Sequence, residues 1–323
     1  MRPTFLLTFD LELVWGSFDH MSASQFEAVY PDVRGVIRDV LGLLETHGIS
    51  ATWAIVGHLF LSDCERGADG RAHPDLPRPA YSWRDEDWFA DDPCTDRHRD
   101  PLWYGDDLVE LLIGASVPQE IASHSFAHAL YETPGCDSSV AAADLDACIT
   151  LARQRGITLR SFVFPRNREG HHAVIRDHGF VAYRGVDPTW YRRIHGPLRR
   201  VAHVADEALG TTPPVTLPVE TLPGLWNIPG SMMLYPRKGS RRFIPMATRR
   251  RRARSGLQRA VREGKVFHLW CHPFNLVHDR SAMLSLLDRL LAEAARLRTA
   301  GALDITTMGA LAVSMQAAEE SGR

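Results

Sequence analysis

Short apolar runs that alternate with longer amphipathic stretches restrict the fold of this sequence more than any other feature. Runs rich in β-branched or aromatic residues have the length of strands at 4–10, 51–56, 119–123, 161–165, 180–184, 225–229, 265–270 and 303–306. Between some of them, residues 24–47, 138–155 and 281–299 repeat apolar side chains near the 3.6-residue period of an α-helix. This alternation predicts an α/β protein with a parallel sheet or barrel and excludes a sandwich.

Two stretches interrupt the alternation. Residues 62–103 are rich in Asp, Arg, Pro and Trp, and residues 192–224 contain a series of prolines. We expect both to be insertion loops in a single domain that spans 1–323, because a barrel of about 250 residues fits this length. The first insertion could form one side of an active site or could be a plain surface loop.

Composition narrows the class of protein. Charged residues make up 24% of the chain and the formal net charge is −2, so a globally basic nucleic-acid binder is not expected. The 5 cysteines form no CxxC pair, which argues against a disulfide scaffold or a cysteine-based zinc site and favours a reducing compartment. Without a signal-peptide pattern or an apolar run of about 18 residues, the expected location is cytoplasmic, with peripheral membrane contact left open.

Two carboxylates close the first expected strand. Asp10 and Glu12 are two residues apart, so on a strand they point to the same face. Neighbouring carboxylates at the end of a buried strand are costly unless a cation or a proton lies between them. The pair therefore suits a metal ligand with an adjacent base, or else both side chains reach solvent.

Histidine pairs add possible metal ligands. His124 and His128 have the HxxxH spacing, which on one helical turn would place both rings on one face. The spacing alone is weak evidence, because the chain has 15 histidines and a second pair, His268 and His272, ends another expected strand. These residues and the acidic pair all fall at carboxyl ends of strands, where barrel active sites lie. Two imidazoles and one carboxylate would leave an open position on a tetrahedral ion, as in catalytic zinc sites.

Together these motifs resemble the polysaccharide deacetylases of the NodB homology class, carbohydrate esterase family 4. The resemblance covers most of the chain in order, through Leu7–Asp10, Ile49–Gly57, Glu120–His128 and Leu269–His272. It implies a distorted (β/α) barrel that removes an N-acyl group, most often N-acetyl, from an amino sugar. It also implies that Asp10 is the base and His272 the general acid. By the same resemblance, Glu12, His124 and His128 bind one divalent ion, zinc in the first place and cobalt or nickel as alternatives.

The sequence departs from the family pattern at three places. Leu11 replaces the second aspartate of the first motif, and Glu12 follows it. Val163 takes the position of an arginine, and we expect Arg166 to supply the cation that orients Asp10. Residues 211–260 lack the aspartate that usually holds the acid histidine, for which Asp187 is a distant candidate.

These departures keep two alternatives open. One is a hydrolase of a non-sugar amide such as a cyclic ureide or imide. The other is a catalytically silent family member that binds a glycan or a protein partner.

A cluster of basic residues bears on the substrate. The segment from Arg237 to Arg254 is dense in arginine and could contact the phosphates of a nucleotide or lipid carrier, or anionic membrane headgroups. It could equally be a solvated helix face. The expected partner is an acylated amino sugar or a glycan intermediate, and no nucleic acid is expected.

Overall fold

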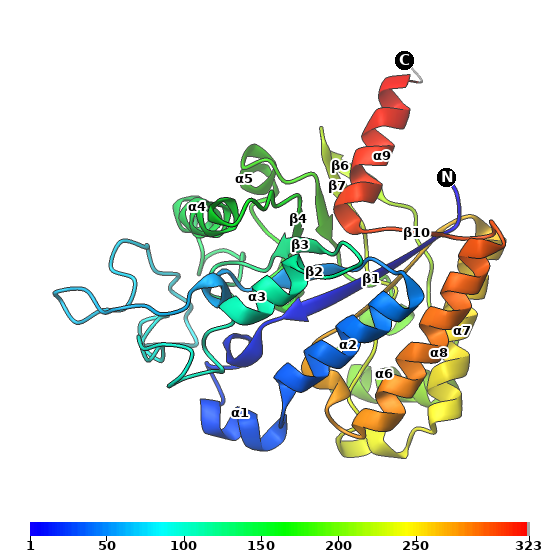
Figure 1. Ribbon diagram of the computed structural model, residues 1–323, viewed down its shortest axis with the longest axis horizontal. Helices are drawn as coiled ribbons and strands as arrows, with labels where there is room; N and C mark the ends of the chain where they lie inside the picture. The colour runs from blue at the N-terminus through cyan, green and yellow to red at the C-terminus, as the bar shows by residue number, and fades with distance from the viewer. Residues whose placement is uncertain (322–323) are drawn as a thin grey trace.

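The computed structural model describes residues 1–321, which form a strongly curved, open sheet covered by helices (Figure 1). The strand order is β6-β7-β5-β4-β3-β2-β1-β9-β8, with β10 paired to β1. All neighbouring strands are parallel except β6 and β7. Because β6 and β8 end the sheet without pairing to each other, the barrel is incomplete, which confirms the predicted distorted (β/α) barrel. The strands are β1 (Thr4–Leu11), β2 (Thr52–Ile55), β3 (Glu120–Ser123), β4 (Ser161–Val163), β5 (Ala182–Arg184), β6 (Val219–Leu222), β7 (Leu225–Asn227), β8 (Met232–Met233), β9 (Val266–Cys271) and β10 (Asp304–Ile305).

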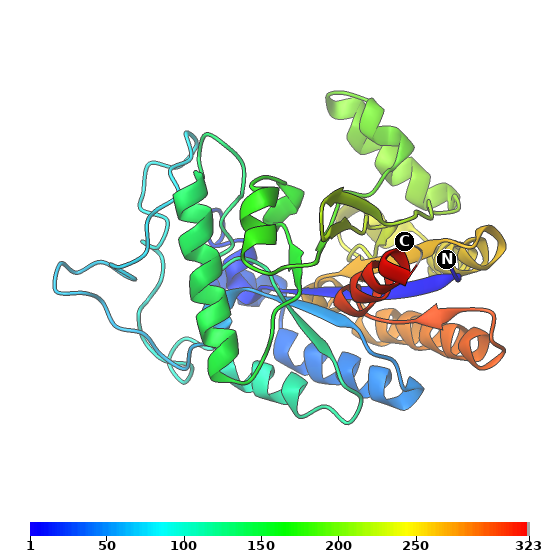
Figure 2. The ribbon, with the colours of Figure 1, turned by 90° about the horizontal axis from the view of Figure 1, so that it is seen from above.

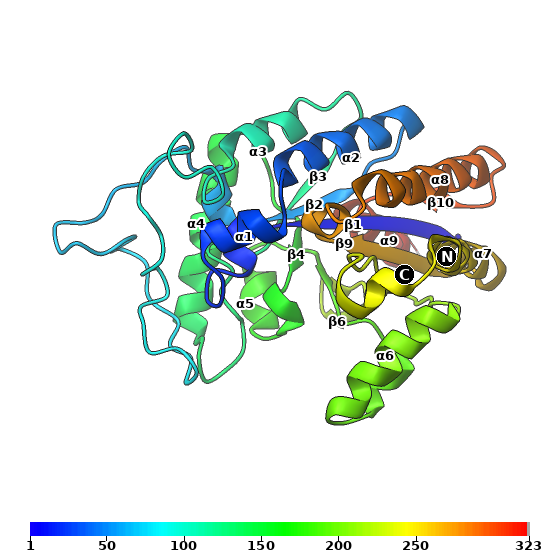
Figure 3. The same cartoon turned by 90° about the horizontal axis from the view of Figure 1, so that it is seen from below.

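Helices α2, α8 and α7 lie next to one another on the outer side of the sheet (Figures 1 and 3). The amphipathic stretch 24–47 is divided into α1 and α2, because Asp32 adopts a left-handed conformation and caps α2 with its side chain. None of the helices in residues 1–321 is long and apolar enough to cross a membrane. The helices are α1 (Ala23–Val29), α2 (Val33–His47), α3 (Asp106–Ile113), α4 (Ser138–Gln154), α5 (His172–Asp177), α6 (Pro197–Leu209), α7 (Met246–Glu263), α8 (Arg280–Thr299) and α9 (Met308–Ser321).

Strand β1 shows how the sequence separates core from site. Phe5, Leu7 and Phe9 are buried in the main core between the sheet and the outer helices. Such side chains contribute about 1.5–3 kcal/mol each by leaving water. The alternate residues point to the concave side, where Leu6 packs in a second cluster with Met308 of α9. Further along this concave face, the same alternation places Asp10 at the carboxyl end of the strand.

The segment 192–224 differs from the loop that the sequence predicted. It contains α6, which begins with Pro197 at its first turn and ends at Gly210 in a left-handed conformation. Strand β6 follows the helix. The prolines that suggested a loop lie after α6, so they mark its exit and not its absence. Figures 2 and 3 show α6 at the periphery of the molecule, beside α7.

Residues 62–103 form neither a helix nor a strand, and their long loops extend beyond the carboxyl end of β1 (Figure 1). Two isolated backbone bridges occur in this insertion. Its large aromatic side chains are nevertheless buried, among them Tyr81, Trp88 and Phe89. Side chains therefore fix this segment where backbone ladders do not.

Candidate active site

Three histidines surround one buried carboxylate at the carboxyl ends of the strands. Glu12 Oε1 lies 2.9 Å from His124 Nε2, 3.3 Å from His128 Nε2 and 3.2 Å from His272 Nε2. Glu12, His124 and His128 offer one ligand atom each, all within 4.8 Å of one another. The structure therefore brings together the metal ligands and the acid histidine that the sequence proposed.

Glu12 is positioned by a tight turn directly after β1. Leu13 adopts a left-handed conformation with φ of 48°, which turns the chain into the short helix Leu13–Gly16. A Cβ atom on Gly16 would lie 1.8 Å from Glu12 Oε2, so only glycine leaves room for this carboxylate. The pKa of Glu12 is raised by burial but lowered more strongly by the neighbouring His272 and His128, and it lies well below its usual value.

The HxxxH pair lies on a loop and not on the helical turn that its spacing suggested. Ser125 and His128 both adopt left-handed backbone conformations, so the loop after β3 folds back and brings the two rings to 5.1 Å between centroids. Asp144 of α4 holds this loop, because it accepts hydrogen bonds from Ser125 Oγ and Phe126 N, both 2.8 Å long. The geometry is thus built by a loop anchored to a neighbouring helix.

The donor set fits a divalent ion. His124 Nδ1 lies 2.7 Å from the carbonyl oxygen of Val163, so that nitrogen carries the proton and the Nε2 lone pair is available to an ion shared with Glu12. Burial lowers the pKa of His128, although Glu12 opposes this, and the neutral ring is the form that binds metals. Two imidazole nitrogens and one carboxylate match the ligands of catalytic zinc sites.

Asp10 is held by an arginine that the sequence analysis missed. Arg184 at the end of β5 donates two hydrogen bonds of 2.6 Å to Asp10, one to each oxygen, and its guanidinium lies 4.0 Å from the ring centroid of Trp270. Burial raises the pKa of Asp10, but the charge and hydrogen bonds of Arg184 outweigh it and hold that pKa below its usual value. Asp10 therefore stays ionised.

The prediction that Arg166 orients Asp10 is wrong. Arg166 adopts a left-handed conformation and pairs with Asp19 at 2.5 Å. Arg166 was predicted for this role because it directly follows Pro165 of the third motif, but its side chain points to Asp19. The sequence did contain a signal for Arg184, because a charged residue at the carboxyl end of the expected strand 180–184 is a candidate for the active site.

His272 lies close to both carboxylates, with Nε2 at 3.7 Å from Asp10 Oδ2. Burial lowers its pKa, but the nearby Glu12 and Asp10 raise it more, so the net pKa is above the usual value. Its ring stacks on Phe274, and its Nδ1 lies 3.5 Å from the side-chain nitrogen Nδ2 of Asn275. The distant candidate Asp187 has another partner: it accepts a hydrogen bond of 3.0 Å from Trp270 Nε1.

A cleft of about 440 Å³ borders this site and is rich in arginine. Trp270, whose ring lies against Arg184, and Asp187, which is hydrogen-bonded to Trp270, line one part of it. The arginines that line it are Arg166, Arg168, Arg192, Arg199 and Arg200. Within residues 1–321, Arg192, Arg199 and Arg200 have no acidic partner at salt-bridge distance. The cleft therefore carries positive charge that intramolecular ion pairs do not neutralise.

The arginines of the segment Arg237–Arg254 mostly serve the fold. Arg252 of α7 pairs with Asp206 of α6, and Arg254 of α7 pairs with Glu293 of α8. Arg241, in the short helix Gly239–Phe243, pairs with Glu207 of α6. Arg237 likewise pairs with Asp279. Arg249 is buried and donates to the carbonyl oxygens of Tyr235 and Arg241. Among residues 1–321, Lys238, Arg242, Arg250 and Arg251 have no acidic partner at salt-bridge distance.

Comparison with solved structures identifies the fold. A protein from Mycobacterium smegmatis assigned to the polysaccharide deacetylases superimposes with a TM-score of 0.62 at 16% identity, over 98% of this chain and 91% of that one. A Pseudomonas aeruginosa PAO1 protein with the same assignment gives 0.57 at 12% identity, over 97% and 93%. An allantoinase gives 0.59 at 13% identity, over 98% and 94%. No family model and no curated protein matches the sequence. The chain therefore has the fold of the polysaccharide deacetylases.

Proposed function

We propose that this protein, which has the polysaccharide deacetylase fold, is a metal-dependent hydrolase that removes an N-acyl group, in the first place N-acetyl, from an amino sugar. The observation that carries the proposal is the convergence of Glu12, His124 and His128 beside an ionised Asp10 and His272. This arrangement contains metal ligands, a base and an acid within a few ångströms. A binding protein without chemistry has no need of such a set.

A divalent ion held by Glu12, His124 and His128 would polarise the acyl carbonyl and make water more acidic. Asp10, kept ionised by Arg184, accepts the proton of the attacking water. His272 donates a proton to the departing amine, which leaves poorly as an anion. Trp270 keeps Arg184 in place, because its ring lies against the guanidinium. The products are the free amino sugar and the carboxylic acid.

We propose further that the substrate carries an anionic group, such as the phosphate of a nucleotide- or lipid-linked sugar. The arginine cleft beside Trp270 supports this, because guanidinium groups bind phosphate through two parallel hydrogen bonds. Arg199 and Arg200 of α6 lie in the cleft, which gives this helix a part in substrate binding. This location replaces the segment Arg237–Arg254 as the proposed phosphate contact.

The test begins with metal content and activity. The protein purified without chelator is compared with His124→Ala and Glu12→Gln, and Glu27→Gln, an exposed glutamate on α1, is the control. We expect both site variants to lose one equivalent of divalent metal and nearly all deacetylation of N-acetylated sugars, and the control to lose neither. Wild-type protein that hydrolyses none of these sugars with its metal in place would refute the proposed activity.

The substrate class is tested separately. N-acetylated amino sugars are compared with and without a linked diphosphate, and allantoin is included as a cyclic ureide. We expect the phosphorylated sugars to have the lowest KM. The double variant Arg199→Ala and Arg200→Ala should raise KM for these substrates and leave kcat unchanged. A preference for neutral sugars, or for allantoin, would contradict the anionic assignment.

A further inference from the structure

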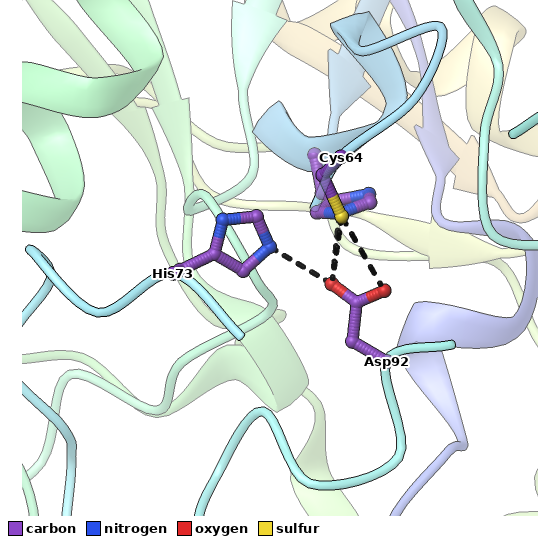
Figure 4. Close-up of side chains that lie close together, drawn as sticks. Cys64, His73 and Asp92 are labelled. Atoms are coloured by element: carbon purple, nitrogen blue, oxygen red, sulfur yellow. Dashed lines mark hydrogen bonds and ion pairs between the residues drawn. The ribbon is translucent and has the colours of Figure 1, made fainter. Parts of the chain in front are cut away.

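A second cluster of metal-binding side chains lies behind the active-site loop. His58, in the short helix Gly57–Phe60, meets Cys64, His73 and Asp92 of the irregular insertion 62–103. Figure 4 shows Cys64, His73 and Asp92 pointing toward one another from separate parts of that insertion. The side chains of His58 and Asp92 are fully buried. The catalytic chemistry proposed above uses none of these groups.

The four ligand atoms all lie within 4.8 Å of one another. Asp92 Oδ2 lies 3.0 Å from His58 Nε2 and 2.8 Å from His73 Nε2. Cys64 Sγ lies 3.8 Å from His58 Nε2 and 3.7 Å from Asp92 Oδ2. Usual zinc bond lengths place tetrahedral ligand atoms about 3.3–3.6 Å apart. These four distances differ from the zinc values by about 0.5 Å or less, so small shifts would bring these pairs to the spacing that an ion requires.

Groups around the cluster orient the donors. His58 Nδ1 lies 3.1 Å from the carbonyl oxygen of Trp103, so it carries the proton and leaves Nε2 free to face the cluster. Tyr104 Oη accepts a hydrogen bond of 2.8 Å from Thr95 N and lies 3.3 Å from Cys64 Sγ, so the hydroxyl can donate to a thiolate.

The charge of the cluster also calls for a cation. The Asp92 carboxylate is buried, yet within residues 1–321 its ion-pair partners are the two imidazoles alone, with no arginine or lysine. By contrast, the buried Asp10 pairs with Arg184, and Asp206 pairs with Arg252. A dication bound by one thiolate, one carboxylate and two neutral imidazoles would have no net charge, which removes most of the cost of burial.

We propose that His58, Cys64, His73 and Asp92 form a structural metal site, for which zinc suits the mixed sulfur, nitrogen and oxygen donors. Four protein ligands leave no open position, which is the pattern of structural and not catalytic sites. This site has a single cysteine and widely spaced ligands, so the cysteine spacing that argued against zinc could not detect it. Metal bonds would here supply the rigidity that the insertion lacks in helices and strands.

The site would also support the catalytic loop. The rings of His58 and His73 both contact Phe126, which lies between His124 and His128, with centroids 5.7 and 5.2 Å apart. In addition, Trp88 of the insertion donates a hydrogen bond of 2.9 Å to the carbonyl oxygen of Ala127. Loss of the structural metal should therefore loosen the loop that carries two catalytic ligands.

The first experiment counts metals in the full-length protein expressed with added zinc. We expect two equivalents in the wild type, one in Cys64→Ser or His73→Ala, one in His124→Ala, and none in the double variant His73→Ala and His124→Ala. His98→Ala, an exposed histidine in the same insertion, is the control and should keep both ions. In the cobalt-substituted His124→Ala protein, a thiolate-to-cobalt charge-transfer band should appear, and Cys64→Ser should remove it.

The second experiment does not depend on the folding of cluster variants. In the His124→Ala background, which should hold only the proposed ion, chelator should expose the arginines of 62–103 to trypsin, and added zinc should protect them again. An identical digestion pattern with and without chelator would overturn the proposal. So would unchanged metal content in both Cys64→Ser and His73→Ala, or a Cys64–Cys94 disulfide found by mass spectrometry of the untreated protein. Each of these results leaves the proposed activity at Glu12 untouched.

Discussion

Replacement of Arg184 by methionine should strongly destabilise the protein, because it removes the guanidinium that pairs with the buried carboxylate of Asp10. Arg184 and Asp10 are only 1% and 2% exposed, and the two hydrogen bonds between them are each 2.6 Å long. Removal of one member of a buried ion pair costs about 3–5 kcal/mol. Methionine fills much of the space of the arginine stem, so packing loss adds little. We expect the free energy of unfolding to fall by about 3–5 kcal/mol.

Urea denaturation followed by tryptophan fluorescence measures this change, in a cycle with Asp10→Asn and the double variant. The double variant should be more stable than the sum of the single losses predicts, by on the order of 2 kcal/mol, because the second change removes the unpaired charge. Arg2→Met is the control. Arg2 pairs with Asp304, and the two side chains are 65% and 40% exposed, so the loss of this pair should cost less than about 1 kcal/mol.

Two results would refute the reasoning. If Arg184→Met costs no more than Arg2→Met, the Asp10 pair does not stabilise the fold as the geometry indicates. If the cycle is additive within error, the two side chains do not interact energetically. Arg184→Met should also lower kcat for deacetylation, since without the cation burial favours a protonated Asp10, which cannot act as a base.

Three further changes probe the surroundings of the site. Gly16→Ala should weaken metal binding about 10–100-fold in a chelator competition, because the new Cβ collides with Glu12. Asp144→Ala should lower the free energy of unfolding by about 2–4 kcal/mol in urea, since it leaves buried donors of the catalytic loop unpaired. Burial and the charge of Arg184 lower the pKa of His268 to about 3, so the unfolded chain binds a proton below about pH 6.5 that the folded chain does not. Stability should therefore fall by roughly 2 kcal/mol between pH 7 and pH 5 through this residue, and His268→Gln should remove that part of the pH dependence. Equal slopes of stability against pH in wild type and His268→Gln would contradict the last prediction.

The sequence predicted those parts of the fold whose signal is local. Apolar runs located the longer strands, because a strand buried on both faces needs a continuous apolar segment. Strands β6 and β8 escaped notice, since β6 is largely exposed and β8 has only two residues. Helix α6 was missed although its apolar side chains recur at helical spacing, because the prolines that follow it favour a loop over the whole segment 192–224.

The site residues show the same contrast between local signals and features that depend on tertiary structure. Asp10, Glu12, His124, His128 and His272 sit in ordered local motifs, so a sequence can identify them one motif at a time. The backbone of the catalytic loop could not be predicted in this way. Its left-handed residues depend on Asp144, which belongs to a helix later in the chain. A spacing of four residues suits a helical turn, but a tertiary contact can bring the same rings together without one.

The position of Arg184 shows how a tertiary relation can replace a missing motif residue. Val163 on β4, at the position where the family carries an arginine, is the Cα partner of Arg184 in the parallel β4–β5 register. Paired residues in neighbouring parallel strands point to the same face of the sheet, about 4.8 Å apart, so a long side chain from either position can reach Asp10. The register between two strands cannot be deduced from the sequence of either one. Sequence proximity alone therefore favoured Arg166, whose side chain pairs with Asp19 instead. Since the cation on Asp10 is present, the loss at position 163 no longer favours a catalytically silent protein.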